Sequence, residues 1–466
     1  MSTKFDTVFI NEEQIFDTLK NSTKEDAVRI REILSKALEL KGLNESEVAS
    51  LAMVSDPDLL KEVFATARRV KEEIYGKRLV LFAPLYVSNL CKNECIYCAF
   101  RSSNTLLRRK ALNQDEVRKE VEAIVDEGHK RILLVAGESY PSEEGFDYII
   151  NCVKTIYSVK KGRGEIRRVN VNVAPLTLEE FKRLKDAKIG TYQLFQETYH
   201  RETYNKMHIR GIKKDYDWRI TAMDRAMEAG INDVGVGVLF GLFDWRFEVM
   251  ALMQHIKHLE EKFGVGCHTI SVPRIEPAVG SEISLHPPYA VSDIDFCKVV
   301  AILRLAVPYT GMIMTTRETP DMRRETFALG VSQISAGSRT NPGGYTGAEE
   351  EDMSQFSLGD HRSPDEVIQD IAQLGYIPSF CTACYRLGRT GADFMDLAKP
   401  GLIKNFCEIN ALNTFAEYLE DYASPKTKEI GWAKIGEILN GMSEARKKRA
   451  EPLLNRVKAG ERDVYV

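Results

Sequence analysis

The sequence predicts an α/β protein whose main domain is a closed (β/α)8 barrel. From residue 77 onward, short runs rich in Val, Ile, Leu and Tyr alternate with helical stretches, which is the pattern of repeated βα units. Eight such runs occupy about 270 residues, the length that a closed barrel needs. Helix caps can be read between the runs, so the two kinds of element are separated by recognisable boundaries.

The expected strands cover residues 78–87, 131–137, 167–174, 191–198, 233–241, 269–277, 312–319 and 332–339. Among the helices, Thr177 and Glu180 have the spacing of a capping box, and Thr319 before Pro320 opens a helix that Gly330 closes. An open barrel of six strands, with the last two strands belonging elsewhere, is the alternative architecture.

Two segments flank the expected barrel, which covers residues 77–345. Residues 1–76 contain charged amphipathic helices, the last opened by Asp56 and Pro57 and closed by Gly76, and they predict an N-terminal helical extension. Residues 346–466 predict a C-terminal, mainly helical domain. At 466 residues, the chain exceeds the usual size of a single core, so a large domain with appendages is expected.

The composition narrows the class of partner. The chain has 64 basic and 68 acidic residues and a net charge of −4, a balance that does not favour nucleic acid or a membrane surface. No run of about 18 apolar residues occurs, and residues 1–20 lack the core of a signal peptide. Nine cysteines without a secretion signal fit metal ligation better than disulfides. We therefore expect a cytosolic protein that acts on a small molecule.

Three cysteines lie close together in the loop after the first expected strand. Cys91, Cys95 and Cys98 form the pattern CxxxCxxC. Thiolates are the ligands of iron–sulfur clusters, and three of them can hold a [4Fe-4S] cube with one iron left open. Unrelated thiols and a zinc site are the alternatives, but zinc motifs usually pair two cysteines with a distant second pair. The pattern favours a redox enzyme.

A second group of cysteines lies near the C-terminus. Cys381, Cys384 and Cys407 form the pattern CxxCx22C. A zinc site of three cysteines and one histidine would need a fourth ligand nearby, yet His361 lies twenty residues before Cys381. These thiols favour a second iron–sulfur cluster over zinc. The remaining thiols, Cys152, Cys267 and Cys297, are expected to be buried side chains in the core.

The first triplet, with an aromatic residue before its last cysteine, resembles the radical S-adenosylmethionine (SAM) superfamily. This resemblance implies that the three cysteines bind a cluster whose open iron chelates SAM and whose electron splits it to a 5′-deoxyadenosyl radical. It also implies that Tyr97 contacts the adenine. The end of the second strand, Ala136-Gly137-Glu138, resembles the family's GGE motif, which meets the amino group of SAM. Without that resemblance, the tripeptide would be a strand-ending turn.

Further polar residues stand where expected strands end, which is where barrel enzymes carry their chemistry. Glu197 ends the fourth strand and is a candidate for contact with the ribose or the ammonium group of SAM, with a surface salt bridge as the alternative. Arg317 follows the seventh strand, and its forked donors suit the carboxylate of an amino acid. Its alternative role is an ion pair with Glu318 or another local acid.

The combined motifs resemble one family more narrowly. The chain looks like the tyrosine lyase of [FeFe]-hydrogenase maturation in four segments: the first triplet, the strand His268 to Arg274, the segment Ser335 to Ser338 and the terminal triplet. The tyrosine lyase of thiamine thiazole synthesis shares the barrel motifs but not the terminal triplet. A radical SAM enzyme acting on another amino acid and a non-catalytic iron–sulfur carrier are the further alternatives.

This resemblance implies a two-stage reaction. L-Tyrosine would be cleaved to p-cresol and dehydroglycine at the first cluster, and the fragment would become carbon monoxide and cyanide trapped on a fifth iron at the second cluster. The resemblance further implies that His268 ligates that iron, that Arg274 contacts the cofactor, and that Ser335 and Ser338 act beside Arg317. Hydrogenase-maturation proteins would be the partners.

The predicted barrel places the two metal centres at opposite ends. His268 precedes the sixth strand, whereas the SAM cluster follows the first. A strand of about eight residues rises ~3.3 Å per residue, so the centres should be roughly 25 Å apart. Carbon monoxide and cyanide would then need an enclosed tunnel, for which the small residues Gly235, Gly237, Ala336 and Gly337 could leave space. Their alternative role is close packing of the backbone.

Overall fold

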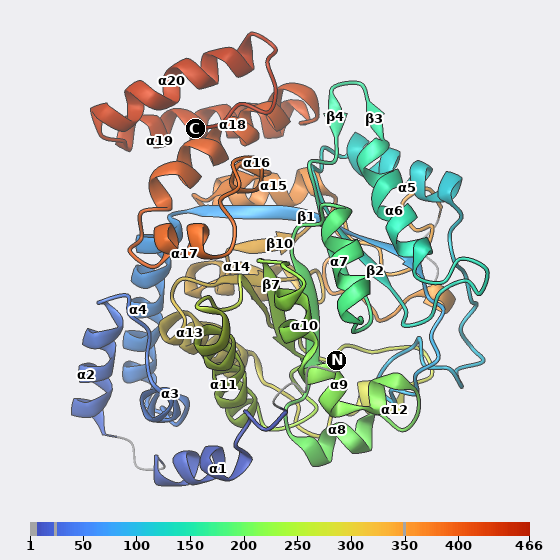
Figure 1. Cartoon of the computed structure of the whole chain (residues 1–466). Helices are drawn as coiled ribbons and strands as arrows, with labels where there is room; N and C mark the ends of the chain where they lie inside the picture. Colours follow the sequence, from blue (N-terminus) through green and yellow to red (C-terminus); the bar gives the residue numbers. More distant parts are fainter. Residues whose placement is uncertain (1–6, 23–25, 348–350) are drawn as a thin grey trace.

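The computed structural model describes residues 7–22, 26–347 and 351–466. Residues 1–6 and 23–25 of the predicted N-terminal extension and residues 348–350 of the predicted C-terminal domain therefore lie outside the described residues. Figure 1 shows a central barrel with helices packed around it, the N-terminal helices α2 to α4 on one side, and the C-terminal helices α18 to α20 across one end of the barrel.

Eight parallel strands form the barrel, in the order and at the places that the sequence predicts. They are β1 (Arg78–Ser88), β2 (Arg131–Ala136), β5 (Arg168–Asn172), β6 (Tyr192–Glu197), β7 (Val234–Val238), β8 (Thr269–Ser271), β9 (Gly311–Met314) and β10 (Gln333–Ser335). Strand β10 pairs with β1 in the register Phe82↔Ser335, which closes the sheet. The closed (β/α)8 architecture is confirmed, and the six-stranded alternative is wrong. The sixth strand is much shorter than predicted, because the chain leaves the sheet after Ser271.

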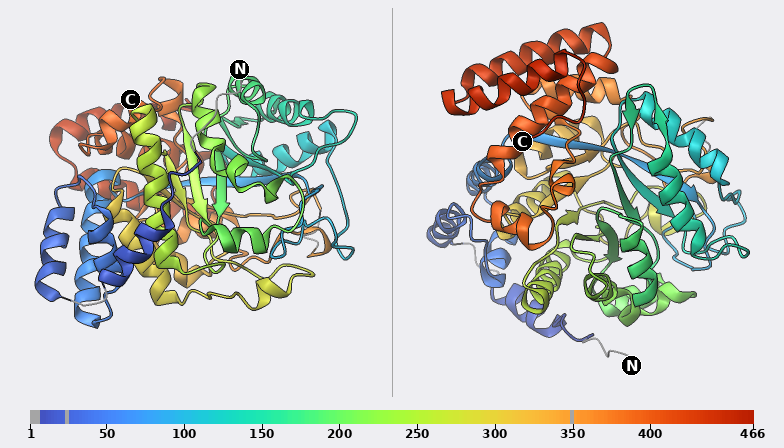
Figure 2. Two further views of the ribbon diagram at one scale, coloured as in Figure 1. Left: turned by 60° about the horizontal axis from the view of Figure 1, so that its bottom comes forward. Right: turned by 45° about the horizontal axis from the view of Figure 1, so that its top comes forward.

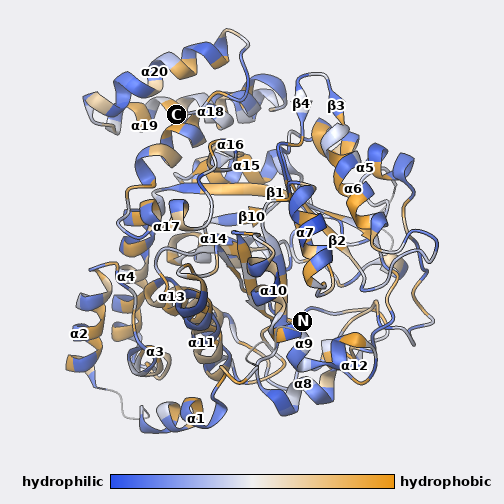
Figure 3. Ribbon diagram, viewed as in Figure 1, coloured by the Kyte–Doolittle hydropathy of each residue, from blue (hydrophilic) through white to orange (hydrophobic). Residues whose placement is uncertain are grey.

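The helices that cover the barrel begin and end near the predicted caps. They are α5 (Gln114–Asp126), α6 (Asp147–Ser158), α7 (Leu178–Asp186), α8 (Arg201–Met207), α9 (Tyr216–Ile220), α10 (Ala222–Glu228), α11 (Trp245–Phe263), α12 (Glu282–Leu285), α13 (Asp293–Ala306) and α14 (Pro320–Leu329). The capping box of Thr177 and Glu180 is present, and Thr319 caps α14. Figure 3 shows hydrophobic and hydrophilic residues alternating along these helices, as amphipathic packing requires. Among the described helices, none is both long and apolar enough to cross a lipid bilayer.

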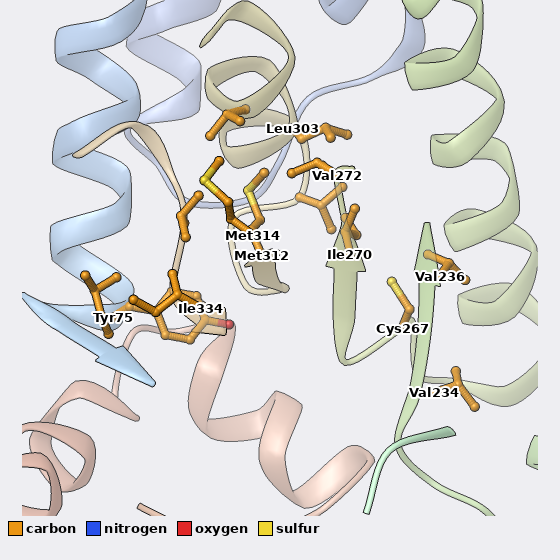
Figure 4. Close-up of a cluster of buried hydrophobic side chains, with 14 of the residues drawn as sticks. Tyr75, Val234, Val236, Cys267, Ile270, Val272, Leu303, Met312, Met314 and Ile334 are labelled. Carbon is orange, nitrogen blue, oxygen red and sulfur yellow. The ribbon is translucent and has the colours of Figure 1, made fainter. Parts of the chain in front are cut away.

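The main core lies between the strands and the helices. Val234 and Val236 of β7 and Ile270 of β8 are buried on the outer face of the barrel, and Figure 4 shows them close to Cys267 and facing the surrounding helices. Cys152, Cys267 and Cys297 are free and buried, as predicted for core thiols. Alternate residues of the same strands point inward, so each strand serves the core with one face and the barrel interior with the other.

The N-terminal extension consists of α1 (Glu12–Asn21), α2 (Ala27–Ala37), α3 (Glu45–Ala52) and α4 (Pro57–Tyr75). Helix α4 begins at Pro57, has Gly76 as its C-cap, and packs against α13 and α14. Its Lys71 is fully buried, and its ammonium group has no hydrogen-bond partner among the described residues and lies 4.7 Å from the centre of the Tyr376 ring. Burial, together with the nearby Arg304 and Arg78, lowers the pKa of Lys71 to about 7.

We expect Lys71→Met to stabilise the fold, and to do so more at pH 7 than at pH 10. The unfolded chain holds Lys71 charged up to about pH 10, whereas the folded chain holds it neutral above about pH 7, so burial of this group costs most at the lower pH. Replacing a buried uncompensated charge by an apolar side chain should gain about 1–4 kcal/mol. Thermal unfolding at both pH values measures the effect, with Lys61→Met on the exposed face of α4 as control. Equal destabilisation at both pH values would contradict this account.

The C-terminal segment rejoins the barrel at the N-terminal end of its strands. Strand β11 (Ile377–Ser379) pairs in parallel with the start of β1 in the register Arg78↔Ile377. The helices of this segment are α15 (Pro364–Gln373), α16 (Ala383–Arg386), α17 (Ala392–Ala398), α18 (Lys404–Asp421), α19 (Pro425–Gly441) and α20 (Glu444–Lys458). Figure 2 shows this segment gathered at one end of the barrel. The predicted boundary at residue 345 thus precedes a segment that contributes a strand to the barrel sheet; the domain division stays a prediction.

Candidate functional sites at the two ends of the barrel

The first triplet of cysteines lies in the loop that follows β1, at the C-terminal end of the strands. Cys91, Cys95 and Cys98 all line one cavity there. Burial raises the pKa of Cys91 to about 11, and it raises the pKa of Cys95 well above its usual value. Thiolates in this loop therefore require a compensating cation, which the irons of a cluster would provide. Three soft donors converging on one cavity from a single loop could hold an iron–sulfur cluster.

The end of β2 is in backbone contact with the cluster loop. Gly137 donates its backbone N–H to the carbonyl of Ser88 at 2.8 Å. A Cβ atom on Gly137 would lie 2.3 Å from the carbonyl oxygen of Leu90, so no side chain fits at this position. The absence of a side chain at Gly137 thus lets β2 and the loop approach each other, and the next residue, Glu138, is directed into the same cavity.

Glu138 and Glu197 are joined by two cations that the sequence did not reveal. Arg219 donates to Glu138 at 2.9 Å and to Glu197 at 3.3 Å, and Lys213 donates to Glu197 at 2.6 Å. Asn93 of the cluster loop donates to the other oxygen of Glu138 at 2.7 Å. Burial opposes the charged form of Glu138, but Arg219 and Lys213 outweigh it and hold the pKa of this carboxyl below its usual range.

The backbone at Glu197 is strained. Its φ angle is +73°, a left-handed conformation that residues with a Cβ rarely adopt, and the pairing of β6 with β7 shifts register at this point. Such strain is held in place by surrounding contacts and is concentrated at functional sites. Here it turns the carboxylate of Glu197 toward Arg219 and Lys213. A surface salt bridge, the alternative role for Glu197, does not describe this buried position.

Tyr97 is held by a histidine that the sequence did not single out. The Nε2 atom of His208 lies 2.8 Å from the hydroxyl of Tyr97, and its Nδ1 atom lies 2.8 Å from the carbonyl oxygen of Tyr204. Burial lowers the pKa of His208 well below its usual value, so the ring is neutral. Because the carbonyl can only accept, Nδ1 donates to it and Nε2 accepts from Tyr97. His208 therefore fixes the orientation of the Tyr97 ring.

The residues predicted to act on substrate share the same cavity. Arg317, Ser335 and Ser338 all line it. The Arg317 guanidinium lies 3.2 Å from the centre of the Phe356 ring and makes no hydrogen bond or ion pair with a described residue. The hydroxyl of Ser335 accepts from the backbone N–H of Thr316 at 3.1 Å, whereas that of Ser338 is buried without a partner among the described residues. The free guanidinium and hydroxyl remain available to a ligand.

Arg274 is not among the residues that line this cavity, and its contact with the cofactor stays a prediction. Its guanidinium donates to Glu318 at 2.9 Å and to Asp293 at 2.7 Å. Glu318 is thereby the partner of Arg274, so the alternative role of Arg317 as the ion-pair partner of Glu318 is wrong. The guanidinium of Arg274 is occupied by these two carboxylates, and its bond to Glu318 connects the loop after β8 to the loop after β9.

The second triplet lies at the opposite end of the barrel. Cys381 follows β11, Cys384 is on α16 and Cys407 is on α18, and all three line a second cavity together with His268. Burial raises the pKa of Cys381 to about 11 and that of Cys384 to about 12. Three arginines also line this cavity: Arg78, Arg131 and Arg389. Soft donors surrounded by arginines suit an anionic thiolate-bound cluster.

His268 has a carboxylate behind it. Its Nδ1 atom lies 3.6 Å from the Oδ1 atom of Asp233, and Asp233 also accepts the backbone N–H of Gly391 at 3.0 Å. Burial lowers the pKa of His268, which keeps the ring neutral and able to bind a metal. Among the described residues, no three His, Cys, Asp or Glu side chains lie close enough together to hold a single metal ion. The four predicted ligands are nevertheless brought to one cavity.

The two cavities approach each other along the barrel axis. Phe82, Ile313 and Ser335 line the first, and the residues two positions earlier on the same strands, Val80, Gly311 and Gln333, line the second. The small residues proposed to leave space do not do so on β7, because a Cβ on Gly235 would lie 2.4 Å from the Thr269 hydroxyl and one on Gly237 would lie 2.6 Å from the Phe195 ring. Close packing is their role, and a continuous tunnel stays a prediction.

Comparison with known proteins agrees with the site at the C-terminal end of the barrel strands. Residues 85–255 match the Radical SAM superfamily model, and residues 271–377 match the Biotin and Thiamin Synthesis associated domain. The 2-iminoacetate synthase of Salmonella typhimurium is 31% identical over 346 residues, which are 74% of this chain and 89% of that protein. The barrel and its cysteine loop thus define a radical SAM enzyme, with SAM and a SAM-binding [4Fe-4S] cluster.

Two solved structures match nearly the whole chain. A crystal structure of HydG, a maturase of the [FeFe]-hydrogenase, is 53% identical, has a TM-score of 0.94, and is covered completely by 98% of this chain. The [FeFe]-hydrogenase maturase HydG from Carboxydothermus hydrogenoformans is 40% identical, has a TM-score of 0.84, and is covered completely by 97% of this chain. The chain belongs to the HydG family.

Proposed function

We propose that this protein cleaves L-tyrosine to p-cresol and dehydroglycine, and that carbon monoxide and cyanide formed from the fragment are bound to iron for assembly of an [FeFe]-hydrogenase active site. The observation that carries this proposal is the pairing of two cysteine triplets at opposite ends of one barrel. The alternative, dehydroglycine synthesis for thiamine, leaves the terminal triplet without a role. A reducing cytosol suits a protein with nine free cysteines.

The first centre would be assembled by the loop after β1. Cys91, Cys95 and Cys98 would hold the [4Fe-4S] cluster. When bound, the cluster and SAM supply reductive cleavage chemistry that removes a hydrogen atom from the substrate. Arg219 and Lys213 hold the carboxylates of Glu138 and Glu197 in place, so these carboxylates can receive the ammonium and ribose groups of SAM. This orientation exists before ligands arrive, which reduces the cost of ordering them.

The substrate side of the cavity is built by the last two strands. Arg317 would bind the carboxylate of tyrosine through its forked donors, which have no competing partner among the described residues. The Phe356 ring beneath the guanidinium restricts its motion and screens it from water. Ser335 and Ser338 supply hydroxyls on the neighbouring strand end. The alternative of a non-catalytic carrier leaves this arrangement unexplained.

The second centre would bind iron as cargo. Cys381, Cys384 and Cys407 would hold a second [4Fe-4S] cluster, and His268 would ligate the fifth iron that receives carbon monoxide and cyanide. His268 is on the barrel, whereas the three cysteines are on the C-terminal segment, so the cargo would lie between the two. Hydrogenase-maturation proteins would accept the product.

Anaerobic turnover tests the proposed function. Reconstituted protein is incubated with SAM, dithionite and tyrosine, and p-cresol is measured by chromatography. We expect p-cresol and 5′-deoxyadenosine in equal amounts, followed by carbon monoxide. If 5′-deoxyadenosine formed only with a different amino acid, that amino acid and not tyrosine would be the substrate. Absence of both products from protein with an intact first cluster would favour a non-catalytic iron–sulfur carrier.

We expect Asp233→Asn to lower carbon monoxide release about 10-fold or more while p-cresol formation stays unchanged. A carboxylate behind a metal-bound histidine fixes the ring and strengthens it as a ligand, and loss of such a partner costs 10–100-fold in metal affinity or activity. Carbon monoxide captured by deoxyhaemoglobin measures the effect. Asp224→Asn is the control, because Asp224 is also buried beside a histidine, His258, but does not line either cavity. A fall in p-cresol with Asp233→Asn would contradict the proposed role.

A further inference from the structure

One carboxylate in the first cavity has no hydrogen-bond or ion-pair partner among the residues that the structure describes. Glu276 lies in the loop after β8 and lines the cavity, and its side chain makes no hydrogen bond or ion pair with a described residue. The other two carboxylates that line this cavity, Glu138 and Glu197, are both paired with Arg219. Glu276 therefore differs from them in being free to bind something that the protein itself does not supply.

The charges around Glu276 affect its pKa, and the nearby Arg274 is already paired with other carboxylates. Burial and the negative charge of Glu318 raise the pKa of Glu276 to about 7, against the opposing effect of Arg317 and Arg274. Arg274 cannot compensate further, because its guanidinium is engaged by Glu318 and Asp293. Glu276 and Arg317 line the same cavity, and each affects the pKa of the other.

Among the described residues that line the cavity, Arg317 is the cation without an ion pair and Glu276 is the anion without one. Lys213 and Arg219, the other lining cations, are committed to Glu138 and Glu197. Glu276 and Arg317 are both half-buried, and an unpaired charge that is partly removed from water is costly, so a ligand that pairs with it recovers part of that cost. One free cation beside one free anion matches the two charges of an α-amino acid.

We propose that Glu276 binds the α-ammonium group of the substrate while Arg317 binds its carboxylate. This inference rests on the proposed function, and it names the group that recognises the amino end of the substrate. Glu276 thereby makes the cavity selective for a whole amino acid over analogues that lack either charge. The two side chains come from neighbouring strand ends, after β8 and β9, so their spacing is set by the barrel and not by the substrate.

Binding of three ligands tests the proposal. The holoenzyme with SAM, without reductant, is titrated calorimetrically with tyrosine, with tyramine, which lacks the carboxylate, and with 3-(4-hydroxyphenyl)propanoate, which lacks the ammonium group. We expect Glu276→Gln to weaken the binding of tyrosine and tyramine about 30-fold and to leave binding of the propanoate unchanged, as loss of one charge pair inside a cavity predicts. Arg317→Gln should show the opposite pattern, weakening tyrosine and the propanoate but not tyramine.

The outcomes are distinct. Equal weakening of all three ligands by Glu276→Gln would show a structural role and overturn the proposal, and so would wild-type affinity for all three. Failure of the wild-type protein to bind tyrosine would overturn the proposed function itself. Glu282→Gln is the matched control, because Glu282 follows the same strand but is exposed on α12 and does not line the cavity.

The pH dependence gives a second readout. Above about pH 7, Glu276 is ionised and can pair with an ammonium group; below it, protonation removes that charge. The groups that set this pKa are Glu318, Arg317 and Arg274, of which the last two stay charged throughout. We therefore expect tyrosine to bind more tightly at pH 8 than at pH 6 in the wild type, with no such change in Glu276→Gln. The same dependence in both proteins would overturn the assignment to Glu276.

Discussion

Replacing Cys384 and Cys407 together with serine should abolish carbon monoxide release and leave p-cresol formation largely intact. Both thiols line the cavity at the N-terminal end of the strands, whereas the proposed tyrosine cavity is at the C-terminal end. Serine cannot replace a thiolate as a ligand for iron, so the second cluster would be lost. The first cluster depends on Cys91, Cys95 and Cys98, none of which is changed. Chromatography and a haem-based assay measure the two products.

The matched control for this double substitution is Cys297→Ser. Cys297 is a buried thiol on α13 that lines neither cavity, so its replacement should leave both products at wild-type amounts. Electron paramagnetic resonance should show one cluster signal in the double variant and two in the control. Loss of p-cresol from the double variant, with its first cluster signal intact, would refute the division of labour between the two ends.

Arg219→Met should lower both p-cresol and 5′-deoxyadenosine formation by about 100-fold or more. Arg219 bridges Glu138 and Glu197, and its side chain is only 3% exposed, so its removal leaves two carboxylates facing each other with Lys213 alone. Breaking a buried ion pair in this way costs about 3–5 kcal/mol. The carboxylates would reorient or take up protons and would no longer match the cationic end of SAM. Calorimetric titration with SAM should show the loss directly.

Arg201→Gln is the control for this substitution. Arg201 is on the neighbouring helix α8 and pairs with Asp217 at 2.8 Å, but its side chain is 43% exposed and does not line the cavity. An exposed pair of this kind is worth about 0–1 kcal/mol, so both products should remain near wild-type amounts. Undiminished SAM binding by Arg219→Met would show that the bridge between the carboxylates is structural.

The attachment of the C-terminal segment explains how two metal centres share one barrel. Strand β11 pairs with the first residues of β1, whereas the first cysteine loop follows the last residues of the same strand. Strand β1 therefore helps to position both cysteine triplets, one at each end of the barrel. The buried ion pair of Arg167 with Glu417, at 2.9 Å, fastens α18 to the start of β5, and α18 carries Cys407, which lines the second cavity.

Much of the fold could be predicted because its signals are local. Runs of apolar residues, capping boxes and the spacing of cysteines within one loop depend on neighbours in the chain, and they located all eight strands and both triplets. The position of Arg317 at the first cavity could be predicted because this residue follows a strand end. Arg274, beside a strand end in the same way, proved to be engaged by Glu318, and chain position could not distinguish these two arginines.

The sequence by itself determined the barrel, its two cysteine triplets and the class of chemistry, because periodicity and ligand spacing are properties of short stretches of chain. Only the tertiary structure decided which polar groups meet: Arg219 and Lys213 bind the two carboxylates, and His208 binds Tyr97. It also left Glu276 without a partner among the described residues. The strength of an ion pair depends on distance and burial in space, and residues far apart in sequence acquire both only when the barrel closes.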